Sequence, residues 1–272
     1  MNRVILKNFE NNNKFVFEND DKYFVIFSSL DFIGNDVFIE VKHHGYLNIL
    51  LTNLNKELNI HIHGEESSNI TVECLFSGEL KNIKITANLD KFTAISGYFA
   101  DFAMKDLHSV VDVHLNGEGA SATWNVASVS AGNDNKKFEI SLYHHVGNTY
   151  GNIDNYGVCK DEGKLLFSGV SHIEKGAKNS KTKQNAKIMV FDRYSNAIAK
   201  PILKIDENEI EASHAATVGK ISDDELFYLT SRGLKEETAK ELITLGYIKP
   251  IINKFSDEEI QNEILSLIER RM

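Results

Sequence analysis

The sequence changes character within one stretch, Glu211-Ala-Ser-His-Ala-Ala-Thr-Val-Gly-Lys-Ile-Ser-Asp-Asp-Glu-Leu-Phe-Tyr-Leu-Thr-Ser-Arg-Gly-Leu234. Before it, apolar and polar residues alternate over short segments. After it, apolar residues recur with the spacing of a helix face. His214 lies at the junction. The stretch therefore separates a strand-rich body from a region of amphipathic helices.

Upstream, residues 35–209 are a succession of short segments with the alternation typical of β-strands. Gly and Asn separate these segments, and the whole chain contains only 2 prolines. Because the period is two, each strand turns one face to a core and the other to water. Strands are predicted at residues 37–41, 47–51, 58–62, 70–76, 83–87, 110–115, 122–129, 138–143, 164–168 and 187–191.

Downstream, the sequence predicts three short helices. Ser222-x-x-Glu225 has the pattern of a capping box, and Gly233 is expected to end the first helix in the left-handed conformation. The acidic run Asp223-Asp-Glu225 resembles a carboxylate pair for catalysis, but its place in a first helical turn is explained by the helix macrodipole. A second helix is expected over residues 235–245 with Gly246 as its stop. A third follows the capping pattern Ser256-x-x-Glu259.

The strand pattern alone does not fix the topology. A sandwich, a barrel and a solenoid all give many short strands with Gly and Asn turns. No clean repeat period appears in the sequence. A parallel β-helix is plausible, because Asn at the corners and stacked apolar strands are its usual ingredients.

The stretch quoted above closely resembles the signature of the SufB/SufD family of iron–sulfur cluster assembly proteins. Ser213-His214-Ala-Ala-Thr217-Val-Gly219 matches the SufD tract Ser-His-Gly-Ala-Thr-Val-Gly, with Ala215 in place of a glycine, and Leu-Phe-Tyr and Ser-Arg-Gly follow. The resemblance implies a mainly β chain with a right-handed parallel β-helix core and a small C-terminal helical region. The expected domains are a lead-in (1–34), a β-helix core (35–209) and a helical subdomain for ATPase docking (210–272).

The resemblance also implies a function. The chain is expected to be a shortened, SufD-like, non-catalytic scaffold of the SUF machinery, working with a SufC-type ABC ATPase and a SufB-like or identical partner. SufB-type chains carry acidic residues on both sides of the histidine and a cysteine upstream, which residues 184–201 lack. His214 is the expected ligand of a transient iron–sulfur cluster shared across the subunit interface. The expected ATPase-docking residues are Leu226, Phe227, Tyr228, Leu229, Arg232, Gly233, Leu242 and Tyr247.

Composition excludes several other classes. The formal net charge of −9 disfavours a nucleic-acid partner. The local basic cluster Lys175 to Lys187 is expected to be a solvated loop. No apolar run is long enough to span a bilayer, which predicts a cytoplasmic protein without membrane contact. No phosphate-binding Gly-rich loop, nucleophile elbow or Ser/His/Asp set is readable, so we expect neither a bound nucleotide nor catalytic residues.

The remaining metal-binding residue types are sparse. Cys74 and Cys159 are expected to be reduced, half-buried thiols, with a role in sulfur transfer or metal binding as the alternative. His61-x-His63 on a strand would project both imidazoles from one face, a spacing that suits a metal, although a solvated strand face is the more common reason. The pairs His43-His44 and His144-His145 would point to opposite faces, and His172 has no assigned role.

Two other functions remain open from the sequence. One is a carbohydrate-active enzyme on a β-helix, which would need a cluster of carboxylates or basic residues in a groove. The other is a purely structural scaffold that holds the ATPase without touching a cluster. The type of cluster and the choice between homodimer and heterodimer cannot be predicted from the sequence.

Overall fold

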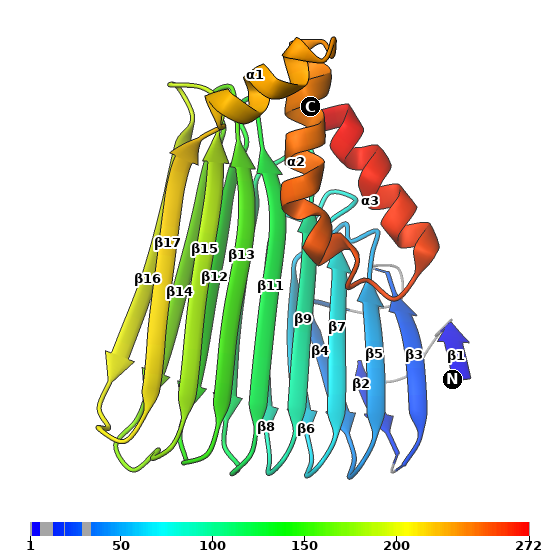
Figure 1. The fold of residues 1–272 in the computed structure, drawn as a ribbon. Helices are drawn as coiled ribbons and strands as arrows, with labels where there is room; N and C mark the ends of the chain where they lie inside the picture. Colours follow the sequence, from blue (N-terminus) through cyan, green and yellow to red (C-terminus); the bar gives the residue numbers. More distant parts are fainter. Residues whose placement is uncertain (1, 6–12, 19, 29–33, 272) are drawn as a thin grey trace.

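The fold is a parallel β-solenoid with three helices packed on one side (Figure 1), as a computed structural model of the chain describes it for residues 2–5, 13–18, 20–28 and 34–271. Over these residues, successive strands alternate between two sheets, and all the recorded strand pairs are parallel. Each pair of successive strands therefore makes one turn of the solenoid. The predicted fold class, a mainly β chain with a parallel β-helix core and a C-terminal helical region, is confirmed.

The first sheet contains the odd-numbered strands β1 (Asn2–Ile5), β3 (Lys22–Phe27), β5 (Tyr46–Leu51), β7 (Asn69–Leu75), β9 (Ala94–Asp101), β11 (Ser121–Ser130), β13 (Tyr150–Cys159), β15 (Lys181–Val190) and β17 (Glu211–Lys220). The second sheet contains β2 (Lys14–Phe17), β4 (Asp36–Val41), β6 (Leu58–Gly64), β8 (Asn82–Leu89), β10 (Leu107–Leu115), β12 (Asn135–His144), β14 (Lys164–Ile173) and β16 (Asn196–Ile205). The helices are α1 (Asp223–Ser231), α2 (Glu236–Ile252) and α3 (Glu258–Arg271).

The core lies between the two sheets and follows from the alternation in the sequence. Ile85, Val111 and Ile140 are partners in register on β8, β10 and β12, and all three are buried. Side chains at such positions stack on the same face, so each turn adds a layer to one continuous apolar interior. At its centre the Trp124 ring is fully buried and meets Phe99 edge to face, with ring centroids 5.2 Å apart.

The predicted strands all fall on observed strands, but within residues 35–209 the three strands β9, β13 and β16 were missed, and one predicted loop is wrong. Strands β9 and β13 were not predicted because their inward positions include glycines, which break the apolar alternation. At one of them, Gly97, the missing side chain leaves room for the Trp124 ring. Most of the basic segment Lys175 to Lys187 is not a solvated loop. It enters β15, because Thr182 and Gln184 alternate with its lysines and point into the interior.

The three helices are present, with two corrections to their ends. Ser222 caps α1 as predicted, its hydroxyl accepting a bond from the Glu225 N–H at 3.2 Å. The second helix does not stop at Gly246 and continues to Ile252. The residues beyond the glycine, including Ile248 and Ile251, are buried against the sheet, and their burial outweighs the cost of about 1 kcal/mol for a helical glycine.

The cap of α3 lies one residue later than the sequence predicts. Asp257, not Ser256, accepts from the Glu259 N–H at 2.8 Å. Ser256 instead donates both its backbone N–H and its hydroxyl to the buried carboxylate of Glu73. Burial is the largest influence on the Glu73 carboxyl and raises its pKa. The serine thus ties the turn between α2 and α3 to strand β7.

Helices α2 and α3 cover the outer face of the odd-numbered sheet (Figure 1). The contact is apolar and includes Phe102 and Val129 from the sheet side with Ile252, Phe255 and Ile268 from the helices. Within the described part of the chain, no helix combines the length and apolar character needed to cross a membrane.

The boundaries of the elements differ from the predicted domain limits. The helices begin at Asp223 rather than at residue 210, because Glu211–Lys220 pairs with β15 as a further strand of the solenoid. Strands also occur within residues 1–34, of which residues 1, 6–12, 19 and 29–33 lie outside the described residues. The division into domains itself stays a prediction.

Candidate functional site

The last turn of the solenoid, formed by β16 and β17, is an open end that carries His214 (Figure 1, yellow). His214 is the partner in register of Gln184, whose side chain is buried in the interior. Register partners on parallel strands project to the same side, so the imidazole faces the interior side of the last turn. His214 is nevertheless exposed, because no further turn follows to cover it.

The surface around His214 is apolar. Its neighbours on the interior side of β17 are Ala212, Ala216 and Val218, the last of which is 45% exposed. Across the solenoid, the interior positions of β16 include Pro201 and Leu203, which are only partly buried. The core of the solenoid therefore ends on a face where apolar side chains and the edges of both sheets meet water.

Directly beneath this face lies a small group of buried polar side chains. The Gln184 amide donates to Ser171 Oγ at 2.8 Å and to the Ile202 carbonyl at 3.0 Å. Thr182 donates to the same serine at 2.8 Å. This group was not predicted from the sequence, although the alternation of Thr182 and Gln184 with lysines indicates inward polar positions.

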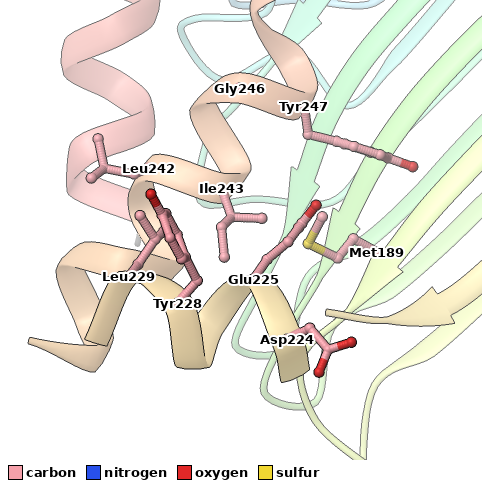
Figure 2. Close-up of a pocket in the computed structure, with 9 residues that line it drawn as sticks. All are labelled: Met189, Asp224, Glu225, Tyr228, Leu229, Leu242, Ile243, Gly246 and Tyr247. Atoms are coloured by element: carbon pink, nitrogen blue, oxygen red, sulfur yellow. The ribbon is translucent and has the colours of Figure 1, made fainter. Parts of the chain in front are cut away.

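A second candidate site is a cavity of about 610 Å³ between α1, α2 and strand β15 (Figure 2). Its wall is mostly apolar, with two carboxylates at one side. Met189 reaches it from β15, opposite the two helices. The lining residues are Met189, Asp224, Glu225, Tyr228, Leu229, Leu242, Ile243, Gly246 and Tyr247.

The structure brings half of the predicted docking residues to this cavity. Tyr228, Leu229, Leu242 and Tyr247 line it. Tyr228 is 56% exposed and Leu242 46% exposed. Tyr247 turns toward the sheet (Figure 2) and packs edge to face on Tyr156, with ring centroids 5.4 Å apart. Met189 and Ile243 were not predicted, because nothing in the sequence shows that their elements meet.

The other predicted docking residues surround the end of α1. Phe227 is 73% exposed, the largest value among the exposed large hydrophobic residues described. The Arg232 guanidinium lies over the Tyr228 ring, 5.1 Å from its centroid. Gly233 has a φ of 93°, which confirms it as the left-handed end of the helix. Leu226 is partly buried.

The two cysteines are buried more deeply than predicted. Both are free thiols and both are fully buried rather than half-buried. Burial raises the pKa of Cys74 well above the ordinary value and that of Cys159 to about 11. The thiolate, which is the nucleophile and metal ligand, is therefore disfavoured at both positions.

The remaining histidines lie mainly on the outer face and edge of the even-numbered sheet. His61 and His63 project from one face, as predicted, and each approaches a different carboxylate, Asp36 at 3.6 Å and Asp90 at 3.3 Å. His144 is buried and bonds Thr149 Oγ1 at 2.7 Å; burial lowers its pKa to about 4. His145 next to it points outward. Among the described residues, no group of three or more His, Cys, Asp or Glu has the arrangement of a metal site.

Comparison with known proteins connects these features to one family. The family model described as "SUF system FeS cluster assembly, SufBD core domain" matches residues 55–247. The chain is 31% identical over 159 residues to the iron–sulfur cluster assembly protein SufD of Bacillus subtilis, covering 58% of this chain and 36% of that protein. It is 31% identical over 145 residues to an iron–sulfur cluster assembly SufBD family protein of Staphylococcus saprophyticus, covering 53% of this chain and 31% of that protein.

The matches to these two curated relatives thus span about a third of each relative's own length. The family match begins in the turn before β6 and ends within α2, so it includes the last turn with His214 and the whole cavity lining. It covers well over half of the 272 residues. The chain therefore belongs to the SufBD family of the SUF iron–sulfur cluster assembly system.

Proposed function

We propose that this chain is a non-catalytic assembly subunit of the SUF machinery, which acts in the cytoplasm. In this proposal the open last turn of the solenoid docks a second chain of the same family, either a SufB-like subunit or another copy. His214 then lies in the interface and donates a ring nitrogen to iron or to a nascent cluster. The cluster is cargo that the assembled interface holds transiently.

The open end of the solenoid is the observation that carries this proposal. Both sheets end there with strand edges whose backbone groups can pair with another chain. The apolar side chains of β17 include Val218, which is 45% exposed, and covering them would gain about 25 cal/mol per Å² of apolar surface buried. A neutral imidazole is a suitable iron or cluster ligand, and one imidazole cannot hold a cluster alone. The other ligands must therefore come from the docked chain.

The surface of α1 and α2 supports the proposed docking of a SufC-type ATPase. Phe227, Tyr228 and Leu242 are exposed beside a cavity of about 610 Å³. Aromatic residues of this kind are frequent at the centres of protein interfaces. A side chain from the ATPase would fill the cavity. Because β17 leads directly into α1, movement of the docked ATPase would be passed to the interface that holds His214.

The cluster role is tested by expressing the chain with its ATPase and partner, and measuring iron and sulfide after anaerobic reconstitution. The parent complex is compared with His214→Ala and with His108→Ala, whose imidazole is partly exposed and bonds Glu139 at 2.8 Å on a distant strand. We expect His214→Ala to lose most of the bound iron and sulfide while His108→Ala keeps it. If His214→Ala and His108→Ala bind equal amounts of iron and sulfide, His214 is not a cluster ligand and the chain acts as a purely structural scaffold.

The docking role is tested by co-purification with the ATPase. We expect Phe227→Ala to reduce the amount of ATPase retained by at least about tenfold, because hot-spot aromatic residues contribute 2 kcal/mol or more. The matched control is Phe92→Ala, which removes a 59% exposed phenylalanine from the turn before β9. Retention of the ATPase at parental levels by Phe227→Ala would place the docking surface elsewhere.

A further inference from the structure

The cavity beside α1 presents negative charge on one side. Asp224 and Glu225, in the first turn of α1, form this part of its wall. In Figure 2 the Glu225 side chain points from the helix toward Met189. Neither carboxylate takes part in an ion pair recorded among the described residues. Both carboxylates are therefore available to a charged group from another chain.

A backbone acceptor adds to the two carboxylates. Gly246 lines the cavity, and the residue four positions after it is Pro250, inside α2. Because proline has no N–H, the Gly246 carbonyl lacks the donor that an α-helix normally supplies. This acceptor belongs to a different helix from the carboxylates and does not depend on the acidic first turn of α1. An occupant that donates hydrogen bonds is therefore favoured.

Two cations of the chain lie near the cavity but meet aromatic rings instead. The Arg232 guanidinium lies over the Tyr228 ring, and the residue is not part of the cavity wall. The Lys187 ammonium lies 5.5 Å from the centroid of Tyr156, the ring that packs on Tyr247. The described residues that line the cavity include neither lysine nor arginine. The charge of the two carboxylates is therefore left for a partner to neutralise.

The rest of the wall is mostly apolar and includes Met189, Leu229 and Ile243. An apolar occupant would cover the carboxylates without giving them a partner, which costs free energy. An acidic occupant would be repelled by them. Lysine and arginine side chains lay their methylene stems along apolar surface and carry the charge at the far end. The wall matches this combination of an apolar stem and a cationic end.

We propose that the cavity receives a long cationic side chain, arginine or lysine, from the ATPase partner. The stem packs against the apolar wall, and the charged end meets Asp224 and Glu225. This inference rests on the proposed docking of the ATPase and adds the chemistry of the residue that enters the cavity. Phe227, exposed beside the cavity, supplies an apolar contact of the same surface.

The first test measures the affinity of the chain for the ATPase by calorimetry at low and at high salt. The double variant Asp224→Asn/Glu225→Gln should bind about tenfold more weakly than the parent at low salt. It should also lose most of the parent's salt dependence, because salt screens exposed charges. The matched control is Glu258→Gln/Glu259→Gln, which removes two charges from the first turn of α3, away from the cavity. The control should bind as the parent does.

The outcomes separate this inference from the docking proposal. If both double variants bind the ATPase equally well while Phe227→Ala binds it weakly, the cavity takes no cation and only the docking surface stands. If the parent does not bind the ATPase, both the docking proposal and this inference are wrong.

A small probe tests the cavity without the ATPase. In protein labelled at the methionine methyl groups, n-butylguanidinium should shift the Met189 resonance, which Met189→Leu identifies. The uncharged probe n-butanol has the same stem and should bind about tenfold more weakly. The variant Asp224→Asn/Glu225→Gln should remove this difference between the probes. An equal response of the parent to both probes would overturn the inference, because it would show an apolar cavity without preference for a cation.

Discussion

Replacing Gly97 with alanine should destabilise the solenoid, because the position faces a fully buried indole. Gly97 on β9 and Trp124 on β11 are partners in register and both point into the core. A Cβ added at Gly97 would lie within 2.6 Å of three carbons of the indole, where real Cβ contacts are longer than 3.0 Å. The ring cannot move away freely, since it is 0% exposed and Phe99 packs edge to face against it.

The size of the effect follows from this lack of space. Overpacking a core typically costs about 1–3 kcal/mol, and a clash with a rigid, enclosed ring belongs at the upper end, about 3 kcal/mol. For a chain of this size the urea dependence of the unfolding free energy is about 3 kcal/mol per M. The unfolding midpoint should therefore fall by about 1 M urea.

Equilibrium urea unfolding, followed by tryptophan fluorescence and circular dichroism, measures this shift. The matched control is Gly219→Ala on β17, where an added Cβ would have nothing within 4 Å, and its midpoint should change by less than about 0.2 M. Combining Gly97→Ala with Trp124→Leu should cost less than the sum of the single changes, because the methyl group then occupies space that the indole vacates. Equal midpoints for Gly97→Ala and Gly219→Ala would refute the steric argument.

Three further predictions concern buried groups. In the parent, the Lys136 ammonium lies 3.0 Å from the fully buried carboxylate of Asp101. Lys136→Met removes this cation and should lower the unfolding free energy, measured by urea unfolding, by about 3–5 kcal/mol. A loss below about 1 kcal/mol would contradict this. Burial lowers the pKa of His144 to about 4, against about 6.5 in the unfolded chain. The neutral, buried imidazole is therefore compatible with the folded state above pH 6.5. As the pH falls from 6.5 toward 4, protonation of the unfolded chain lowers the unfolding free energy by about 3 kcal/mol. Between pH 7 and pH 4, the parent should therefore lose more stability than His144→Asn, and parallel pH profiles would disprove the assignment. Ile268→Ala, which empties a fully buried position between α3 and the sheet, should cost about 2–5 kcal/mol by the same urea assay, and an unchanged midpoint would mean that α3 contributes little to the fold.

Several features of the fold could be predicted from the sequence because they depend on residues that are close together in it. The alternation in residues 110–115 and 122–129 predicts strands with one buried face, since a strand's side chains alternate by geometry alone. The cap at Ser222 and the left-handed Gly233 were predicted for the same reason, because a helix end is satisfied by residues within a few positions of it. The strand β9 was missed because the glycine at position 97 is required by the Trp124 ring that packs over it, and Trp124 is 27 positions away in the sequence.

The candidate site also contains residues that could be predicted from the sequence and residues that could not. His214 and the aromatic residues of α1 were predicted from the sequence, since the family signature is contiguous there. Met189 and Ile243 in the cavity were not, because each depends on contacts between separate elements.

By itself, the sequence determined that this chain is mostly short strands followed by helices, and that it carries the SufB/SufD signature around His214, whose resemblance implied a parallel β-helix. Only the tertiary structure decided the register of the strands, that His214 faces an uncovered end, and that α2 and α3 shield one sheet. The physical reason is that local periodicity records which face of an element is apolar, whereas the register between strands and the packing of helices are set by contacts between residues far apart in the chain.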